Sequence, residues 1–211
     1  MKTKIFYTII VIMFFTSCKK MLYETTANIT LVDITTKKPI ANADVYLLNR
    51  DNTSWSGPQN TSLVTHYKTN NLGKCTFVFT PEEYGWFEFA AEADGYYEND
   101  DFDNGIIQDI GKVNDMILEM HPEAYVKVYI KNISPYNSND IIKVYGVASP
   151  SSWGGEHSYN GLDVDTFTIS TTYGNHYRSD NYYVRKNNIE TQYSYEFYCP
   201  AHDTTYYYIN Y

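Results

Sequence analysis

The side chains in this 211-residue chain that are able to do covalent, acid–base or metal chemistry are few and scattered. Its histidines show neither a His-Glu-x-x-His motif nor any paired spacing that binds metal, and no Gly-x-Ser-x-Gly elbow is present. The pair in Cys199-Pro-Ala-His202 stands alone. We therefore expect no catalytic residue, no metal site and no cofactor, and we predict that the protein is not an enzyme. The five histidines are His66, His121, His157, His176 and His202.

Cys18 is the one residue whose setting predicts a specific chemistry. Two lysines precede an apolar run, Ile5 to Phe15, whose 11 residues are too few to span about 30 Å of hydrocarbon as a helix but suit a signal peptide. The run ends in Phe15-Thr16-Ser17-Cys18, which resembles the lipobox of bacterial lipoproteins. This resemblance implies that residues 1–17 are a cleaved signal peptide, that Cys18 receives acyl chains such as palmitate, and that residues 18–23 are a lipidated linker.

The same segment predicts where the protein is located. Several acyl chains on Cys18 give an effectively permanent membrane attachment, at about 0.8 kcal/mol for each buried methylene. Lys19 and Lys20 stand where an aspartate would signal retention in the inner membrane, so the resemblance favours the outer membrane, with the periplasmic or surface face undetermined. The alternatives are a plain secretory signal with an incidental cysteine, or an uncleaved membrane anchor.

Composition excludes one class of partner. The formal net charge is −9. Loss of Lys2 and Lys4 with residues 1–17 leaves 14 basic against 25 acidic residues, a charge of −11. A nucleic-acid partner requires a basic face, and no cluster of lysine and arginine larger than a pair occurs, so we expect none.

Two tryptophans and one acidic loop are candidate binding elements. Trp55 and Trp153 lie in polar, loop-like segments, where an exposed indole stacks on a sugar ring; the alternative is that each caps the end of a sandwich. Residues 98–105 cluster carboxylates and amides as a calcium loop does, but they fail the EF-hand spacing. A solvated acidic turn is the expected alternative.

Strand-like alternation dominates the remainder of the chain. Val126, Val128 and Ile130 alternate with polar or aromatic neighbours and take one face of a strand. The same alternation predicts two further core faces, one with Cys75, Phe77 and Phe79 and one with Phe87, Phe89, Ala91 and Ala93. Tyrosine is in excess, with 23 residues, and the chain lacks helical periodicity. The sequence predicts an all-β fold, in which many tyrosines of the second half are partly exposed.

A boundary is expected near Pro122. Turn signals recur at the spacing of a β-sandwich, and a fresh strand begins after His121-Pro122-Glu123. We predict two consecutive antiparallel β-sandwich domains of immunoglobulin-like or transthyretin-like type, residues 24–122 and a tyrosine-rich domain of residues 123–211. Cys75 and Cys199 then belong to different domains, and we expect two free thiols rather than a disulfide.

The first predicted domain resembles a known family. The motif residues are Asp33-x-x-Thr36-x-x-Pro39-Ile40, then Thr69-Asn-Asn-Leu-Gly73-x-x-x-Phe77, then Gly95-Tyr96, and a last strand that ends before Pro122. In this order they resemble the carboxypeptidase regulatory-like, transthyretin-like domain over residues 27–122. The family has no catalytic residues, so the resemblance implies a sandwich that acts as a spacer or interaction module and implies no peptidase activity.

These observations favour a non-enzymatic, membrane-anchored module at the bacterial envelope that holds a partner protein. Two alternatives stay open. The first is a glycan-binding lipoprotein of a polysaccharide-capture system, with Trp153 and Trp55 as its contacts. The second is a pilus-type subunit, which requires an exchangeable edge strand; the aromatic segment 204–211 is the place to look for one.

The lipobox resemblance generates the first prediction. Cys18→Ala should move the exported protein from the detergent phase to the aqueous phase, because no other apolar run is long enough to anchor the chain. Detergent-phase partitioning measures this change, with Cys75→Ala as the matched control that should remain in the detergent phase. A Cys18→Ala protein that still partitions into detergent would contradict the lipoprotein assignment.

Overall fold

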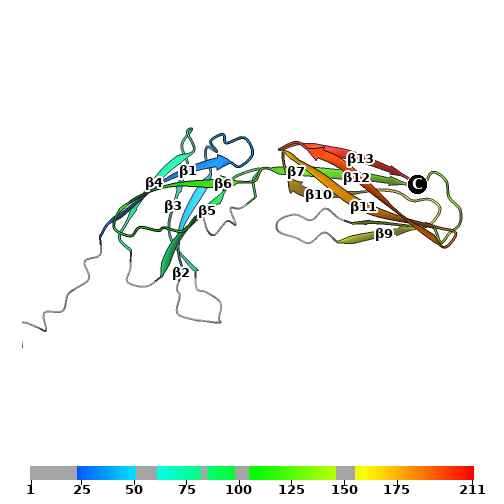
Figure 1. The fold of residues 1–211 in the computed structure, drawn as a ribbon, viewed down its shortest axis with the longest axis horizontal. Coiled ribbons are helices and arrows are strands. Elements are labelled where there is room, and N and C mark those ends of the chain that lie inside the picture. The colour runs from blue at the N-terminus through cyan, green and yellow to red at the C-terminus, as the bar shows by residue number, and fades with distance from the viewer. Residues whose placement is uncertain (1–22, 51–60, 82–84, 98–104, 146–154) are drawn as a thin grey trace, which may run out of the picture.

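The computed structural model describes residues 23–50, 61–81, 85–97, 105–145 and 155–211, and these residues are almost entirely β-strand. The all-β prediction is confirmed (Figure 1). In the described part of the chain, no helix is long and apolar enough to cross a membrane. The strands are β1 (Thr25–Asp33), β2 (Asp44–Arg50), β3 (Thr61–Lys68), β4 (Lys74–Phe79), β5 (Trp86–Glu92), β6 (Val113–Met120), β7 (Glu123–Lys131), β8 (Ile141–Tyr145), β9 (Glu156–Asn160), β10 (Asp165–Tyr173), β11 (His176–Lys186), β12 (Ile189–Cys199) and β13 (Thr204–Asn210).

The strands form four sheets that share two cores. Sheets β4-β1-β6 and β3-β2-β5 enclose one core and are called here the first sheet pair. Sheets β10-β7-β13 and β12-β11-β8-β9 enclose the other core and are called the second sheet pair. β1 and β7 bury alternate side chains along their length, and two sheets that face each other satisfy this pattern.

The sheets are not purely antiparallel, and this corrects the sequence-based expectation. β1 pairs with β6 in parallel, and β7 pairs with β13 in parallel. In each sheet pair the first strand is the middle strand of a three-stranded sheet. The last strand lies beside it, runs in the same direction and forms one edge of that sheet. Alternation with period two fixes which side chains face inward but does not determine strand direction.

The two sheet pairs repeat one topology. In each pair the first strand lies between the fourth and the last, while the second strand lies between the third and the fifth. The second pair adds β12 beside β11. The equivalent place beside β5 holds Ile106, which bridges Glu88, and Ile107, whose N–H donates to the Phe87 carbonyl at 2.9 Å. The two sheet pairs therefore correspond even beside β5 and β11, where residues 106–107 of the first pair take the place of β12 in the second.

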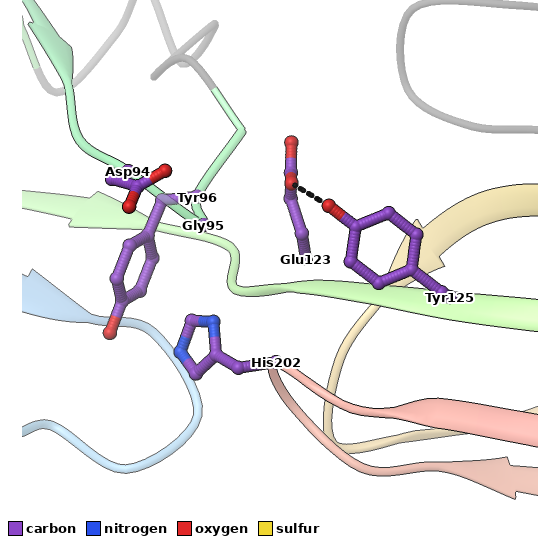
Figure 2. Close-up of a pocket in the computed structure, with 6 residues that line it drawn as sticks. All are labelled: Asp94, Gly95, Tyr96, Glu123, Tyr125 and His202. Atoms are coloured by element: carbon purple, nitrogen blue, oxygen red, sulfur yellow. Dashed lines mark hydrogen bonds between the residues drawn. The ribbon is translucent and has the colours of Figure 1, made fainter.

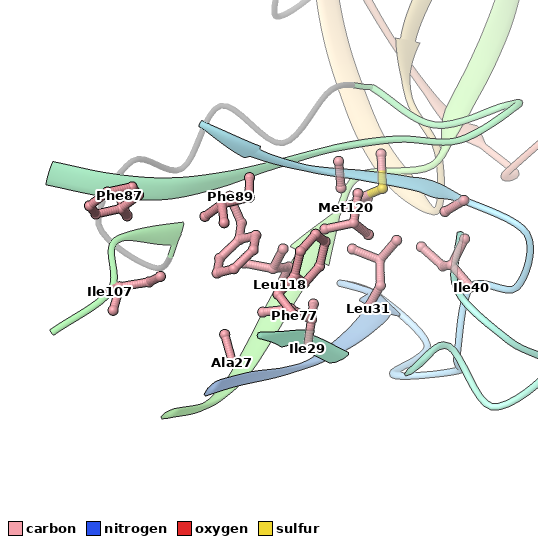
Figure 3. Packing of buried hydrophobic residues seen from close by; sticks show 14 residues of the cluster. Ala27, Ile29, Leu31, Ile40, Phe77, Phe87, Phe89, Ile107, Leu118 and Met120 are labelled. Carbon is pink, nitrogen blue, oxygen red and sulfur yellow. The ribbon is translucent and has the colours of Figure 1, made fainter. Parts of the chain in front are cut away.

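The first core is filled by the side chains that alternation predicts (Figure 3). Phe77 is fully buried, and its ring centroid lies 4.9 Å from that of Phe89 and 4.9 Å from that of Tyr67. Cys75 and Phe79, on the same face of β4 as Phe77, pack against this core while partly exposed. The buried members are Ala27, Ile29, Leu31, Ile40, Ala43, Val45, Leu47, Phe77, Phe87, Phe89, Ala91, Ile107, Leu118 and Met120.

The second core combines aliphatic side chains with tyrosine. Val126, Val128 and Ile130 are buried, as the alternation predicts. Tyr195 is also buried, and its ring stacks on Tyr207 with centroids 4.5 Å apart. Cys199 lies in this core whereas Cys75 belongs to the first, and both are free thiols, as expected.

Buried or partly buried charged side chains interrupt the apolar pattern. Glu88 is paired with Arg50, and Asp180 is paired with Arg178 at 3.0 Å. Asp140 is fully buried and accepts hydrogen bonds from the Tyr136 N–H and from Asn132 Nδ2. Burial acts to raise the pKa of Asp140, but these hydrogen bonds outweigh it and hold the pKa below its ordinary value. Each buried charge therefore has the partners that its burial requires.

The packing of Phe77 yields a prediction about stability. Phe77→Ala should lower the free energy of unfolding by about 3–5 kcal/mol, because a fully buried ring leaves a cavity between the two sheets. Val78→Ala is the matched control, since Val78 is the next residue, points outward and is 55% exposed, so its loss should be below about 1 kcal/mol. Denaturant melts of both variants measure the difference. Equal losses would show that the faces of β4 are assigned wrongly.

Candidate functional site

Only two residues, His121 and Pro122, connect the two sheet pairs between the end of β6 and the start of β7. Backbone hydrogen bonds hold this connection from both sides. The Tyr97 N–H donates to the His121 carbonyl at 2.9 Å, and the Gly174 N–H donates to the Pro122 carbonyl at 2.7 Å. Loops of both sheet pairs therefore hold the connection. We call these two hydrogen bonds, together with two further ones made by the Glu123 backbone, the junction clamp.

Glu123 completes the junction clamp through its own backbone. Its N–H donates to the Gly95 carbonyl at 2.8 Å, and its carbonyl accepts the His202 N–H at 2.7 Å. One residue thereby joins the 93–97 turn of the first sheet pair to the 200–203 turn of the second. Gly95 has a φ of +75°, and a Cβ placed there would lie 2.9 Å from His202 Nδ1. Glycine is therefore required both by the backbone conformation and by the close approach.

Aromatic side chains pack around the clamp. The His121 ring lies 4.3 Å from Tyr173, and Tyr97 meets Tyr173 edge-on at 5.4 Å. Burial lowers the pKa of His121, although Glu119 and Asp33 oppose this shift, so the imidazole is neutral at pH 7. This neutral ring serves packing at the junction.

A cavity of about 440 Å³ lies beside the clamp (Figure 2). The first sheet pair contributes the 94–96 turn to its wall, and the second contributes Glu123, Tyr125 and His202. The Tyr96 ring meets the His202 ring with centroids 5.0 Å apart. Pockets of this kind occur where two packed units meet. The lining residues are Asp94, Gly95, Tyr96, Glu123, Tyr125 and His202.

The cavity's electrostatics favour a hydrogen-bonding or cationic group over an acid–base role. Tyr125 donates its hydroxyl to Glu123 Oε2 at 3.3 Å, and the Glu123 charge raises the pKa of Tyr125. Burial raises the pKa of Tyr96, with Asp33 adding to the effect through a hydroxyl hydrogen bond of 3.4 Å. Both tyrosines therefore remain protonated at neutral pH and act as hydrogen-bond donors.

A second candidate surface covers the outer side of sheet β10-β7-β13. Tyr129 on the central strand stacks on Tyr208 with centroids 5.0 Å apart and ring planes 8° apart, and on its other side it meets Phe167 at 5.9 Å. The pairing register places Phe167, Tyr129 and Tyr208 in one row across the three strands. This surface is named the tyrosine face and consists of Lys127, Tyr129, Phe167, Ile169, Tyr206 and Tyr208.

The tyrosine face is exposed and rigid. Phe167 is 50% exposed and Tyr208 is 63% exposed. Lys127 Nζ lies 4.1 Å from the Phe167 ring centroid and 4.8 Å from that of Tyr129, so a cation caps two rings of the row. Cross-strand stacking of this kind fixes the rings and stabilises the sheet.

Several residues singled out by the sequence fall outside the described residues. These are Cys18, Trp55, Trp153 and most of the acidic loop. Cys199 and His202 are near in sequence, but Cys199 belongs to the second core and His202 lines the junction cavity. Within the described residues, no group of three or more histidine, cysteine or acidic side chains is placed to hold a metal ion.

Sequence reasoning missed both the junction cavity and the tyrosine face. The sequence held a signal for the junction cavity: Gly95-Tyr96 follows the end of one predicted strand, and Glu123 begins another. A signal for the second was the alternation of Tyr206 and Tyr208 with inward-facing residues of β13. Neither signal specifies which segments come together, because strand pairing is set by long-range contacts.

No family model matches the chain, and no curated protein matches its sequence. Among solved structures, the chain is similar to the Bacillus anthracis TIE protein (13% identity, TM-score 0.38, covering 89% of this chain and 34% of that one). It is also similar to GBS52, the minor pilin of Streptococcus agalactiae (11% identity, TM-score 0.38, 88% and 94%), and to BcpA, the major pilin subunit of Bacillus cereus (10% identity, TM-score 0.30, 84% and 69%). The chain spans about a third of the length of the TIE protein chain. These identities and TM-scores are too low to assign a family.

The close packing at the junction predicts the effect of one added methyl group. A Cβ at Gly174 would lie 2.6 Å from the Ala201 Cα, so Gly174→Ala forces backbone apart and should cost about 1–3 kcal/mol of folding free energy. Gly155→Ala is the control, because no atom lies within 4 Å of a Cβ there. Denaturant melts of the two variants test this, and a Gly174→Ala protein as stable as Gly155→Ala would contradict the close approach of Gly174 to Ala201.

Proposed function

We propose that the protein is a lipid-anchored, non-enzymatic module of the bacterial outer membrane that holds a partner protein. In this proposal Cys18 carries the lipid, residues 24–122 and 123–211 are two β-sandwich domains, and the tyrosine face is the contact surface. The observation that carries the proposal is the exposed, ordered row of stacked aromatic rings on sheet β10-β7-β13.

Two features support the division into domains. The two hydrophobic clusters share no residue, so each sheet pair has a core of its own. Each pair also completes the same topology independently. The junction clamp then orients one domain on the other.

The first domain also supports the proposed relationship to carboxypeptidase regulatory-like domains. Asp33 Oδ1 accepts the N–H of Thr35 at 2.8 Å and that of Thr36 at 2.7 Å. Burial acts to raise the pKa of Asp33, but these bonds and that from the Thr35 hydroxyl keep the pKa below its ordinary value. This turn gives the Asp-x-x-Thr part of the motif a structural reason, since the aspartate caps the turn that follows β1.

The tyrosine face suits a protein partner for physical reasons. Tyrosine is typical of the centres of protein–protein interfaces, as is a cation beside it. A tyrosine ring buries much surface area while losing little side-chain conformational entropy. A glycan instead requires a free ring face on which to stack. The Tyr129 ring is stacked on Tyr208 on one side and has the tilted Phe167 ring on the other, so it offers mainly its edge and hydroxyl for contact.

The glycan alternative rests on Trp153 and Trp55, which the sequence singles out. The pilus-type alternative rests on the terminal segment, which forms β13 and pairs in parallel with β7 of its own sheet. Ile209 is fully buried in this pairing. Exchange of β13 between subunits would have to extract that side chain from the core, which disfavours this alternative.

The proposal predicts the location of partner contacts. A photo-reactive benzoylphenylalanine at Tyr129 in the full chain should cross-link to a second protein in intact cells, because Tyr129 is at the centre of the tyrosine face. The control is the same amino acid at Tyr177, an exposed tyrosine of the other sheet, which should give no discrete adduct. Gel shift and mass spectrometry identify the adduct. Adducts at Tyr177 but not at Tyr129 would place the contact elsewhere.

A further inference from the structure

We propose that the protein associates side by side with further copies of itself, through pairing of β13 of one copy with β10 of the next. Both strands are edges of the sheet β10-β7-β13, and the tyrosine face continues across the contact. This interface uses the edges of the sheet, whereas the partner of the proposed function contacts its face.

The edge at β13 lacks the protection that edge strands usually have. Charged side chains and proline normally prevent one free strand from pairing with another. β13 contains only threonine, tyrosine, isoleucine and asparagine, and it is the one described strand with no charged residue. The other described edge strands all carry charge, at Lys68 in β3, Lys74 in β4, Glu88 and Glu92 in β5, Asp115 and Glu119 in β6, Glu156 in β9, Asp165 in β10, and Glu190 and Glu196 in β12.

β10 offers a matching edge. Its single charged residue, Asp165, is at the start of the strand and is paired with Lys131 at 2.7 Å. The following eight residues of β10 are uncharged and contain no proline. Since the chain carries a net charge of −9, two uncharged edges are the surfaces on which copies approach with least repulsion.

Strand direction and register make the two edges complementary. β13 runs parallel to β7 and β10 runs antiparallel to it, so β13 meets β10 of an equally oriented copy as an antiparallel pair. Phe167 and Tyr208 are at the two ends of one row, because both are opposite Tyr129. A neighbouring copy in the same row register therefore places its Phe167 against Tyr208, and its Ile169 against Tyr206.

The occupant of this edge is a second copy because the row of rings ends in an aromatic side chain on both sides. The contact joins two different surfaces, so each copy that is added still offers a free edge to a further copy. Equally oriented copies also keep their N-termini on one side, which is compatible with the lipid anchor of the proposed function. The natural twist of the sheet makes each copy rotate relative to the last.

Disulfide trapping in cells that produce the full chain tests the register directly. A chain with both Tyr208→Cys and Phe167→Cys should form, after mild oxidation, a ladder of dimers, trimers and larger species on a non-reducing gel. The ladder should collapse to monomer when a thiol reductant is added. Co-expression of the two single variants should give dimers and no larger species, because each chain then offers one reactive edge. The control is Tyr145→Cys with Tyr177→Cys, two exposed positions of the other sheet, which should give no ladder.

A charge at the edge provides an independent readout. Tyr206→Lys should reduce the ladder about tenfold by placing an ammonium on the neutral edge, whereas Tyr206→Phe should preserve it. Tyr206 is 57% exposed, so neither change disturbs the core. No ladder from the double-cysteine chain, despite cysteines that react with maleimide, would overturn the proposal. A chain with Tyr206→Cys and Tyr208→Cys that forms cross-linked dimers, when the double-cysteine chain above does not, would also overturn the proposal. That result would indicate a symmetric pair of two β13 strands.

Discussion

The architecture depends on the junction clamp, in which four backbone hydrogen bonds hold a two-residue connection between β6 and β7. A short connection by itself only limits the distance between two units. Here the carbonyls of His121, Pro122 and Glu123 are each engaged by an N–H from a different turn, so the direction of the chain is fixed as well. Two of these turns, 93–97 and 200–203, also contribute to the wall of the junction cavity.

Core and surface have separate roles in each sheet pair. Each sheet pair buries its own apolar cluster, and neither needs the other to complete its core. The outward side chains of the second pair are then available for contact. Stacking among Phe167, Tyr129 and Tyr208 keeps those side chains ordered in the absence of a partner, which reduces the entropic cost of binding.

The sequence predicted the parts of this structure that depend on local pattern. Alternation assigned Phe77, Phe89 and Val128 to the cores correctly, because burial repeats with the period of a strand. It did not reveal the parallel pairing of β1 with β6 or of β7 with β13, since direction depends on how distant strands meet. For the same reason the sequence does not reveal that His202 reaches across to Tyr96.

Amide hydrogen exchange of the full chain tests the junction clamp most directly. The amides of Tyr97, Glu123, Gly174 and His202 should exchange slowly, at rates near those of central β7 residues such as Val128, because each donates to a carbonyl at the connection. Asn188, in the β11–β12 turn, provides the fast reference. Exchange of the four junction amides at the rate of Asn188, while Val128 stays protected, would show that the two sheet pairs are joined by a free hinge and would contradict this account.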